Sequence, residues 1–303
     1  MTRDMRIDRL IDGLLAERQP AFSFEFFPPR TDEGERALFN TVAQLRELEP
    51  TFVSVTYGAA GSARTHTLDV VTRIRRELDI EPMAHFTCVG ADRDELTEVL
   101  DAIEASGIDN VLALRGDPPN GADEFVPAEG GLAHGSDLVS LISSSYPFCV
   151  GAACYLEKHI ESPSLDDDLR YARLKVDNGA RFLITQLFFD NRLYFEFMGM
   201  ARAAGITVPI IPGIMPITNV DQIQRFTSRI GAAIPPALLD ALLTRRDDPD
   251  AVIQLGVAWA TLQCAELLAQ GAPGIHFYTL NRSPATRAIL SALRASKPWE
   301  KAG

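Results

Sequence analysis

The chain has 303 residues, of which 46% are hydrophobic and 23% are charged, and this composition is typical of a soluble globular protein. A formal net charge of −12 argues against general nucleic-acid binding and against adsorption to an anionic membrane. No apolar run reaches the length that crosses a membrane. The cysteines form no C-x-x-C pair, so we expect reduced thiols and a cytoplasmic location; they are Cys88, Cys149, Cys154 and Cys264.

The first predicted element is an amphipathic helix at about residues 3–18, where apolar side chains recur at helical spacing among charges of both signs. Those charges distinguish the segment from a signal peptide. Eight short apolar runs follow, and each predicts a β-strand: Ala21–Phe27, Phe52–Thr56, Pro82–Thr87, Asn110–Arg115, Phe148–Ala153, Arg181–Gln186, Val208–Gly213 and Ile275–Thr279.

Segments with helical periodicity separate these runs. One of them begins with Asp92 and Glu95, a pair that resembles a capping box. The gap before the last strand is longer and holds two extra helices. The predicted helices are Asp32–Leu48, Asp92–Ala105, Leu165–Asn178, Asn219–Ile230, Pro235–Leu243, Pro249–Gln270 and Ser283–Arg294.

Strands that alternate with helices indicate a parallel sheet. The first seven strands begin about thirty residues apart, which is the length of one βα unit. We therefore predict an α/β fold of the closed (β/α)8 TIM-barrel type, as a single domain over residues 1–303. The alternative is an open doubly wound sheet, but neither G-x-G-x-x-G nor G-x-x-x-x-G-K-[ST] occurs in the chain.

Glu25 stands out because it is a carboxylate inside a strongly aromatic run. Charged side chains are seldom buried unless they are paired or functional. Two interpretations are open: an exposed position on an edge strand, or a buried carboxyl whose pKa is raised by its aromatic neighbours. The second would suit a general acid near neutral pH.

Nearly every predicted strand delivers a polar group at its carboxyl end, where barrels of this type carry their chemistry. A set of this size is hard to obtain from packing requirements alone, and it suggests one large polar site. Single members keep structural interpretations: His85 suits a core histidine, and Lys175 suits a solvated helix face as well as phosphate binding. The histidines and cysteines show no ligand spacing typical of a metal site, and we expect no metal.

Six motifs together resemble the bacterial, FAD-dependent 5,10-methylenetetrahydrofolate reductases, over about residues 20–290. The family is a flavin-containing (β/α)8 barrel, in agreement with the strand count. The motifs are Phe22–Arg30, Val53–Ala59, Leu112–Pro119, Ile184–Phe189, Ile211–Pro216 and His276–Arg282.

The resemblance implies a ping-pong reaction. NADH or NADPH reduces bound FAD, and methylenetetrahydrofolate then replaces the nicotinamide and accepts a hydride, which gives 5-methyltetrahydrofolate. Glu25 matches the glutamate that protonates folate N10. Asp117 matches an aspartate that stabilises the cationic iminium. Gln186 matches a glutamine that contacts folate and nicotinamide in turn.

The resemblance also assigns the binding residues. Substrate contacts fall on Thr56, Gln186, Tyr278 and Arg282. FAD contacts fall on Thr56, Tyr57, Ala59, His85, Arg115, Gly116, Asp117, Gly135, Tyr155, His159, Ser162, Asp168, Tyr171 and Lys175. Among these, Arg115, His159 and Lys175 would supply positive potential for the pyrophosphate and ribityl region.

The chain departs from the family pattern at Val220, where some relatives have an aromatic residue that stacks on the nicotinamide cofactor. It also departs at Cys154–His159, where relatives often have Ala-Tyr-Pro. Because the chain stops at Gly303, we expect no C-terminal regulatory extension and no feedback by S-adenosylmethionine. No pattern distinguishes NADH from NADPH, because the cofactor does not sit in a Rossmann crevice.

We expect a homodimer or homotetramer, with the long insertion before the last strand as a possible interface. Three other functions stay open on the residues alone. One is a flavin-free, NADH-dependent reductase, and another is a non-catalytic folate- or flavin-binding protein. The third is a barrel lyase or aldolase with Glu25 as base, for which Lys158 is the nearest candidate for a Schiff base.

Overall fold

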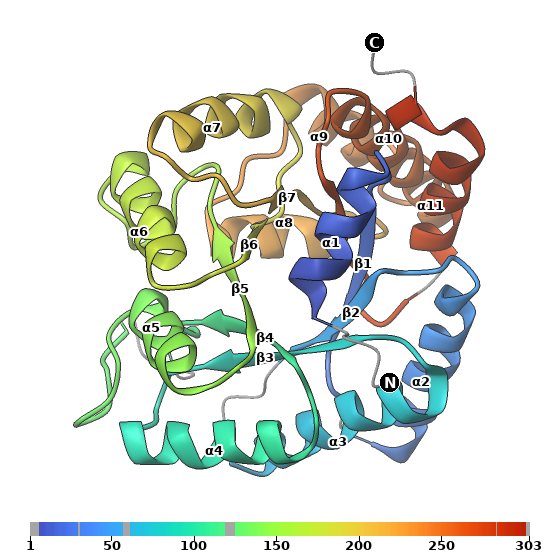
Figure 1. The fold of residues 1–303 in the computed structure, drawn as a ribbon. Helices are drawn as coiled ribbons and strands as arrows, with labels where there is room; N and C mark the ends of the chain where they lie inside the picture. Colours follow the sequence, from blue (N-terminus) through green and yellow to red (C-terminus); the bar gives the residue numbers. More distant parts are fainter. Residues whose placement is uncertain (1–5, 30, 57–60, 119–124, 283, 301–303) are drawn as a thin grey trace.

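The computed structural model describes residues 6–29, 31–56, 61–118, 125–282 and 284–300, and its strands form a nearly closed parallel barrel surrounded by helices (Figure 1). Nine strands belong to one sheet in the order β7-β6-β5-β4-β3-β2-β1-β9-β8. They are β1 (Ala21–Phe26), β2 (Phe52–Val55), β3 (Pro82–Thr87), β4 (Asn110–Leu114), β5 (Cys149–Cys154), β6 (Phe182–Thr185), β7 (Ile210–Ile211), β8 (Gly213–Ile214) and β9 (Gly274–Tyr278). The predicted (β/α)8 architecture is confirmed.

The barrel closes at Pro212. The seventh predicted strand is two short pieces, β7 and β8, and Pro212 lies between them. β7 pairs with β6 and β8 pairs with β9, so the two edges of the sheet are consecutive pieces of the chain. Proline has no N–H to give to a ladder, which explains the break, but its carbonyl still accepts a hydrogen bond from the His276 N–H at 3.0 Å. The prediction of one continuous strand at Val208–Gly213 was therefore wrong.

The helices cover the outside of the sheet (Figure 1). The capping box is present at the start of α4, where the Glu95 N–H and the Asp92 carboxylate make one of its two bonds. Three helices were absent from the predicted set: α3, α5 and α7. The helices are α1 (Ile7–Ala16), α2 (Asp32–Arg46), α3 (Gly61–Leu78), α4 (Arg93–Ala105), α5 (Gly135–Ser145), α6 (Leu165–Asp177), α7 (Asn191–Ala203), α8 (Val220–Ile230), α9 (Pro236–Leu243), α10 (Pro249–Ala269) and α11 (Pro284–Ser296), followed by the 3-10 turn η1 (Pro298–Glu300).

Helix α1 covers the mouth of the barrel at the amino ends of the strands, and Figure 1 shows it across the middle of the ring. Ile7 and Ile11 are fully buried there in a cluster that includes Phe52 and Met83. The Ile7 N–H donates to the Asn110 side-chain oxygen at 2.8 Å. The apolar face of α1 seals this mouth, which explains the amphipathic pattern of the segment. The carboxyl ends of the strands form the open end of the barrel.

Among the described residues, one helix is long and apolar enough to cross a membrane by length and composition, namely α10. The expectation that no apolar segment has this length was therefore wrong. Its Leu267 and Leu268 pack into the main core, and Val252 packs into a second cluster with Leu187 and Ile217. These contacts are those of a helix packed inside a globular domain, and such a helix passes the same test.

The mouth that α1 covers, called the lower mouth below, holds a buried carboxyl group. Glu81 is 2% exposed, and its Oε1 accepts a hydrogen bond from the Asn110 amide at 2.6 Å. Its Oε2 has no hydrogen-bond partner among the described residues. Burial raises the pKa of Glu81 to about 7. Asn110 therefore joins this carboxyl to the backbone of α1.

We predict that Glu81 makes the stability of the fold depend on pH. A raised pKa favours the protonated carboxyl in the folded state, so this stabilisation is complete below pH 4.5 and is lost as the pH rises through about 7. The expected loss is about 3 kcal/mol. Glu81→Gln should remove it, which urea unfolding at pH 5 and pH 8 would measure. The exposed Glu98→Gln is the control, and equal pH slopes in wild type and Glu81→Gln would refute the prediction.

Candidate active site

Glu25 points into the barrel because side chains alternate along a strand. Phe22, Phe24 and Phe26 point outward into the main core between sheet and helices. Ser23 and Glu25 face the interior, and Glu25 is 9% exposed. Of the two interpretations of Glu25, the buried one is therefore correct. The phenylalanines next to it in sequence lie on the other face of the strand.

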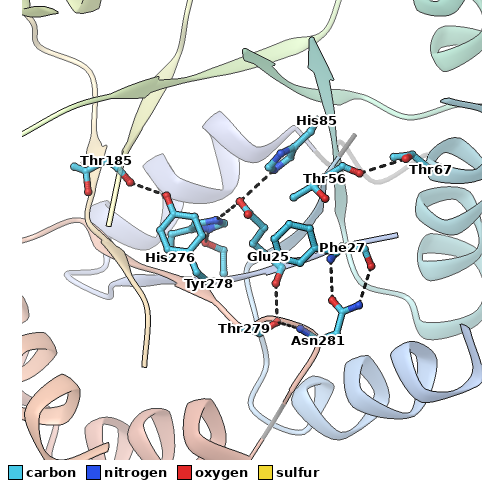
Figure 2. A network of polar contacts seen from close by, with 11 residues as sticks. Glu25, Phe27, Thr56, Thr67, His85, Thr185, His276, Tyr278, Thr279 and Asn281 are labelled. Atoms are coloured by element: carbon cyan, nitrogen blue, oxygen red, sulfur yellow. Dashed lines mark hydrogen bonds and ion pairs between the residues drawn. The ribbon is translucent and has the colours of Figure 1, made fainter. Parts of the chain in front are cut away.

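Two imidazoles surround the Glu25 carboxylate (Figure 2). The His276 Nε2 lies 3.3 Å from Glu25 Oε2, and the His85 Nε2 lies 3.4 Å from the same oxygen. The other ring nitrogen of His276, Nδ1, is 2.8 Å from the Ser23 hydroxyl. Since β1 and β9 are neighbours with Ser23 opposite His276, the closure of the barrel brings this chain of groups together.

The pKa of Glu25 is lowered, which contradicts the expected rise. Burial alone raises the pKa of this carboxyl, but His85 and then His276 act against burial, and their effect prevails. Burial also lowers the pKa of His85 to about 4, so its ring is neutral at neutral pH. A neutral His85 contributes little charge, so the hydrogen bond from His276 carries more of the stabilisation. Glu25 is therefore ionised at neutral pH, and its histidine neighbours stabilise the carboxylate.

The backbone around Glu25 is held by the turn that follows β9 (Figure 2). The Thr279 hydroxyl donates to the Glu25 carbonyl at 2.6 Å. The Asn281 side chain accepts from the Phe27 N–H at 2.8 Å and donates to the Phe27 carbonyl at 2.9 Å. Asn281 and Leu280 both have left-handed backbone, with φ of 58° and 52°. Together these bonds fix the end of β1, where the carboxylate is attached.

Tyr278 and Gln186 form the side of the site next to β6 and β8. The Tyr278 hydroxyl donates to the Thr185 carbonyl at 2.8 Å. A Cβ at Gly213 would come within 2.6 Å of the Tyr278 ring, so glycine is required for this approach. The Gln186 Oε1 accepts from the Leu187 N–H at 2.9 Å, which leaves its NH₂ as the group that can turn to a ligand.

A cationic cluster lies at the ends of β4 and β5. Arg115 follows β4 directly, and its guanidinium pairs with Glu161 in the loop between β5 and α6. The Lys175 ammonium donates to the Ala153 carbonyl of β5 at 2.8 Å. A Cβ at Gly135, the first residue of α5, would lie 3.3 Å from the Arg115 N and 3.8 Å from the Lys175 Cε. Gly135 therefore lets the N-terminus of α5 lie close to the end of β4 and to the stem of Lys175.

The loop between β5 and α6 is ordered by the other predicted flavin residues. Asp168 accepts a hydrogen bond from the His159 N–H at 2.5 Å, and the His159 ring stands edge-on to Tyr155 with centroids 4.9 Å apart. The Ser162 hydroxyl donates to the Ser164 carbonyl at 3.0 Å. Tyr171 lies nearby, where its hydroxyl is 3.4 Å from the His134 ring in front of α5.

The remaining predicted flavin and substrate residues that the structure describes lie outside the cationic cluster of Arg115 and Lys175. Thr56 directly follows β2, and its N–H donates to the Phe26 carbonyl of β1 at 2.8 Å. Gly116 has φ of 91° and fits against Val89 without a side chain. Asp117 and Arg282 are exposed at the same end of the barrel. Tyr57 and Ala59 lie outside the described residues.

The sequence argument missed Ser23, His276, Thr279 and Asn281 as functional candidates. A usable signal existed for two of them. Ser23 and Glu25 share one face of β1, and His276 and Tyr278 share one face of β9, as the two-residue period of a strand requires. Among the described residues, no group of three or more His, Cys, Asp or Glu side chains is arranged to hold a metal ion.

Comparison with known proteins identifies the family. The family model described as "Methylenetetrahydrofolate reductase" matches residues 10–294. The chain belongs to the methylenetetrahydrofolate reductase family. The "5,10-methylenetetrahydrofolate reductase" of Escherichia coli is 38% identical over 271 residues, which are 89% of this chain and 90% of that protein.

Longer and more distant proteins are similar as well. "Methylenetetrahydrofolate reductase (NADH) 1" of Arabidopsis thaliana is 39% identical over 98% of this chain, but this chain spans only about half of that protein, 53% of its length. A Clostridium thermocellum protein that binds two copies of 5-methyl-5,6,7,8-tetrahydrofolic acid shares the fold, with a TM-score of 0.62 over 95% of this chain and 99% of that one. Its sequence identity is 18%.

We predict that the Asn281 clamp stabilises the end of β1. Asn281→Gly should lower the free energy of unfolding by about 1–2 kcal/mol, because two hydrogen bonds to Phe27 are lost while glycine keeps the left-handed backbone. Asn281→Ala should lose about 1 kcal/mol more, because alanine strains that backbone. Urea unfolding would measure both. A glycine variant as stable as wild type would show that the clamp contributes nothing.

Proposed function

We propose that the chain reduces 5,10-methylenetetrahydrofolate to 5-methyltetrahydrofolate with bound FAD, and with NADH or NADPH as the hydride donor. Family membership supports the reaction, and the buried Glu25 carboxylate between His85 and His276 is the structural observation that carries it. Such a group is expensive to bury unless it is paired or used in chemistry. Its position at the open end of the barrel suits contact with a substrate.

The residues at the ends of β4 and β5 fit a flavin dinucleotide. Arg115, Lys175 and the N-terminus of α5 offer donors and positive charge for a diphosphate. When bound, FAD supplies two-electron hydride chemistry that no protein side chain provides. His159 and Asp168 order the loop on this side of the cofactor.

Glu25 is the general acid in this proposal. Opening of the imidazolidine ring of the substrate requires a proton on N10. Because the lowered pKa leaves Glu25 ionised at neutral pH, the carboxylate must first take up a proton, as the substrate binds, before it can pass that proton to N10. After the transfer, the contacts with His276 and His85 stabilise the carboxylate. His276 can serve both states, since its Nε2 can donate to a carboxylate or accept from a carboxylic acid, while Ser23 adapts at Nδ1.

Other groups around the site orient the substrate. The Gln186 NH₂ can donate to a planar amide-bearing ring, and Arg282 can pair with a carboxylate tail. Asp117 adds negative charge near a cationic iminium. Val220, the position where some relatives have an aromatic residue, begins α8 and is buried in a hydrophobic cluster with Met215 and Ile217. A cytoplasmic homodimer or homotetramer stays a prediction.

The lyase or aldolase alternative has little support from the lysine positions. The Lys158 ammonium donates to the Ser162 carbonyl at 2.8 Å within its own loop. Schiff-base chemistry needs an amine that can reach the substrate carbonyl.

Anaerobic titration of the purified protein tests the proposal. We expect flavin absorbance that NADH or NADPH bleaches and that methylenetetrahydrofolate restores. A protein with no flavin bands after addition of FAD would refute the flavin-dependent reaction. Folate reduction by NADH without flavin would favour the flavin-free reductase instead. Bleaching without restoration would show a flavin that the nicotinamide cofactor reduces but that does not reduce the folate, and would refute the proposed reaction.

Glu25→Gln should separate the two half-reactions. Glutamine keeps the shape of the side chain but cannot donate an acidic proton, so restoration by methylenetetrahydrofolate should slow by about a hundredfold or more. Bleaching by the nicotinamide cofactor should stay within about threefold of wild type, because it needs no proton on N10. Glu81→Gln, at the opposite mouth, is the matched control. If both half-reactions keep their rates in Glu25→Gln, another group is the acid.

A further inference from the structure

The Arg115 guanidinium is already fully engaged with a carboxylate. Its Nη1 donates to Glu161 Oε2 and its Nη2 donates to Glu161 Oε1, each at 2.7 Å. Its flat face lies over the Phe125 ring at 4.4 Å, and its Nε donates to the Gly116 carbonyl at 3.3 Å. The hydrogen bond from Arg115 is the main cause of a lowered pKa at Glu161, so the pair is ionised at neutral pH.

This ion pair occupies the cationic cluster described above. Gly135 at the start of α5 lies against the Arg115 backbone and the Lys175 stem. The Glu161 N–H donates to His159 Nδ1 at 3.1 Å, which ties the acidic residue to another member of the cluster. Glu161 therefore places a negative charge against Arg115 and His159, at the point where the guanidinium would otherwise be free for an anionic ligand.

A carboxylate and a diphosphate use a guanidinium in the same way, through two parallel N–H···O bonds from one edge of the fork. In Arg115 that edge is the Nη1–Nη2 edge, and Glu161 takes both of its bonds. The Nε edge points at Gly116, and one face is covered by Phe125. A diphosphate can therefore gain the bidentate contact only if Glu161 gives it up.

We propose that Glu161 is a built-in competitor for the diphosphate of the cofactor, which sets the affinity of the site by exchange on Arg115. The proposal rests on the flavin-dependent function proposed above. Without ligand, the pair holds the β4 end and the β5–α6 loop together and keeps the guanidinium oriented. On binding, one anion replaces another, and the free energy of breaking the Glu161 pair is subtracted from the affinity. Glu161 acts through Arg115 and has no part in hydride or proton transfer.

Binding to the full chain stripped of flavin tests the exchange. Glu161→Gln keeps the size of the side chain but removes its charge, so FAD and inorganic pyrophosphate should each bind about five- to tenfold more tightly. Riboflavin, which has no phosphate, should bind with unchanged affinity. Fluorescence quenching reports the flavins, and calorimetry reports pyrophosphate.

Glu157→Gln is the matched control. Glu157 belongs to the same loop and carries the same charge, but its Oε1 accepts from the Ala233 N–H at 2.9 Å, a bond that glutamine can keep. This variant should change the affinities for FAD and pyrophosphate by less than about twofold. In an Arg115→Gln background, Glu161→Gln should no longer tighten binding, because the fork on which the exchange occurs is absent.

The outcomes separate this proposal from the flavin proposal. Equal or weaker binding of FAD and pyrophosphate to Glu161→Gln would overturn the exchange and leave Glu161 as a residue that only orders Arg115. Tighter pyrophosphate binding in a chain that binds no FAD would sustain the exchange and refute the flavin-dependent function. If Glu157→Gln tightened the binding of FAD and pyrophosphate to the same extent, the exchange would also be overturned. The total negative charge of the loop would then explain the tighter binding.

Discussion

The contact of the Glu25 carboxylate with two imidazoles inside a parallel barrel organises the rest of this molecule. A charge at that depth requires partners, and the partners come from three strands: β1 carries Glu25, β3 carries His85 and β9 carries His276. These strands meet only because the sheet curls until β9 lies beside β1. The same closure brings Thr279 and Asn281 over the end of β1, where they hold the backbone that presents the carboxylate.

The two mouths of the barrel differ in chemistry as well as in position. At the lower mouth, α1 and its isoleucines seal the interior, and the buried Glu81 is satisfied by Asn110 on one oxygen only. That carboxyl responds to burial with a raised pKa of about 7. Glu25 is also buried, but its pKa is lowered because histidines lie against it. Two glutamates of similar burial therefore have opposite protonation preferences, and the neighbours of each decide the direction.

The open mouth, at the carboxyl ends of the strands, is crowded with side chains that already have hydrogen-bond or ion-pair partners within the protein. Tyr278 bonds to Thr185, Gln186 bonds to Leu187, and Arg115 bonds to Glu161. Ligand binding at such a site is an exchange of partners, and its affinity reflects what is given up as well as what is gained. Internal pairing also keeps the site ordered, since each side chain is held near the position from which it would meet a ligand.

The sequence by itself determined the architecture, because strand and helix periods are local, and its contiguous family motifs supplied most of the candidate site residues. Eight βα units and the placement of Glu25 on β1 followed from such patterns, and the structure confirms the barrel. Only the tertiary structure decided what surrounds Glu25. The aromatic neighbours in sequence suggested a raised pKa, but alternation along β1 turns Phe24 and Phe26 away, and closure brings His276 from 251 residues further along the chain. The strands that pair with β7 and β8, the buried side chains of α10 and the pairing of Arg115 with Glu161 were likewise beyond the sequence, since each depends on contacts between distant segments.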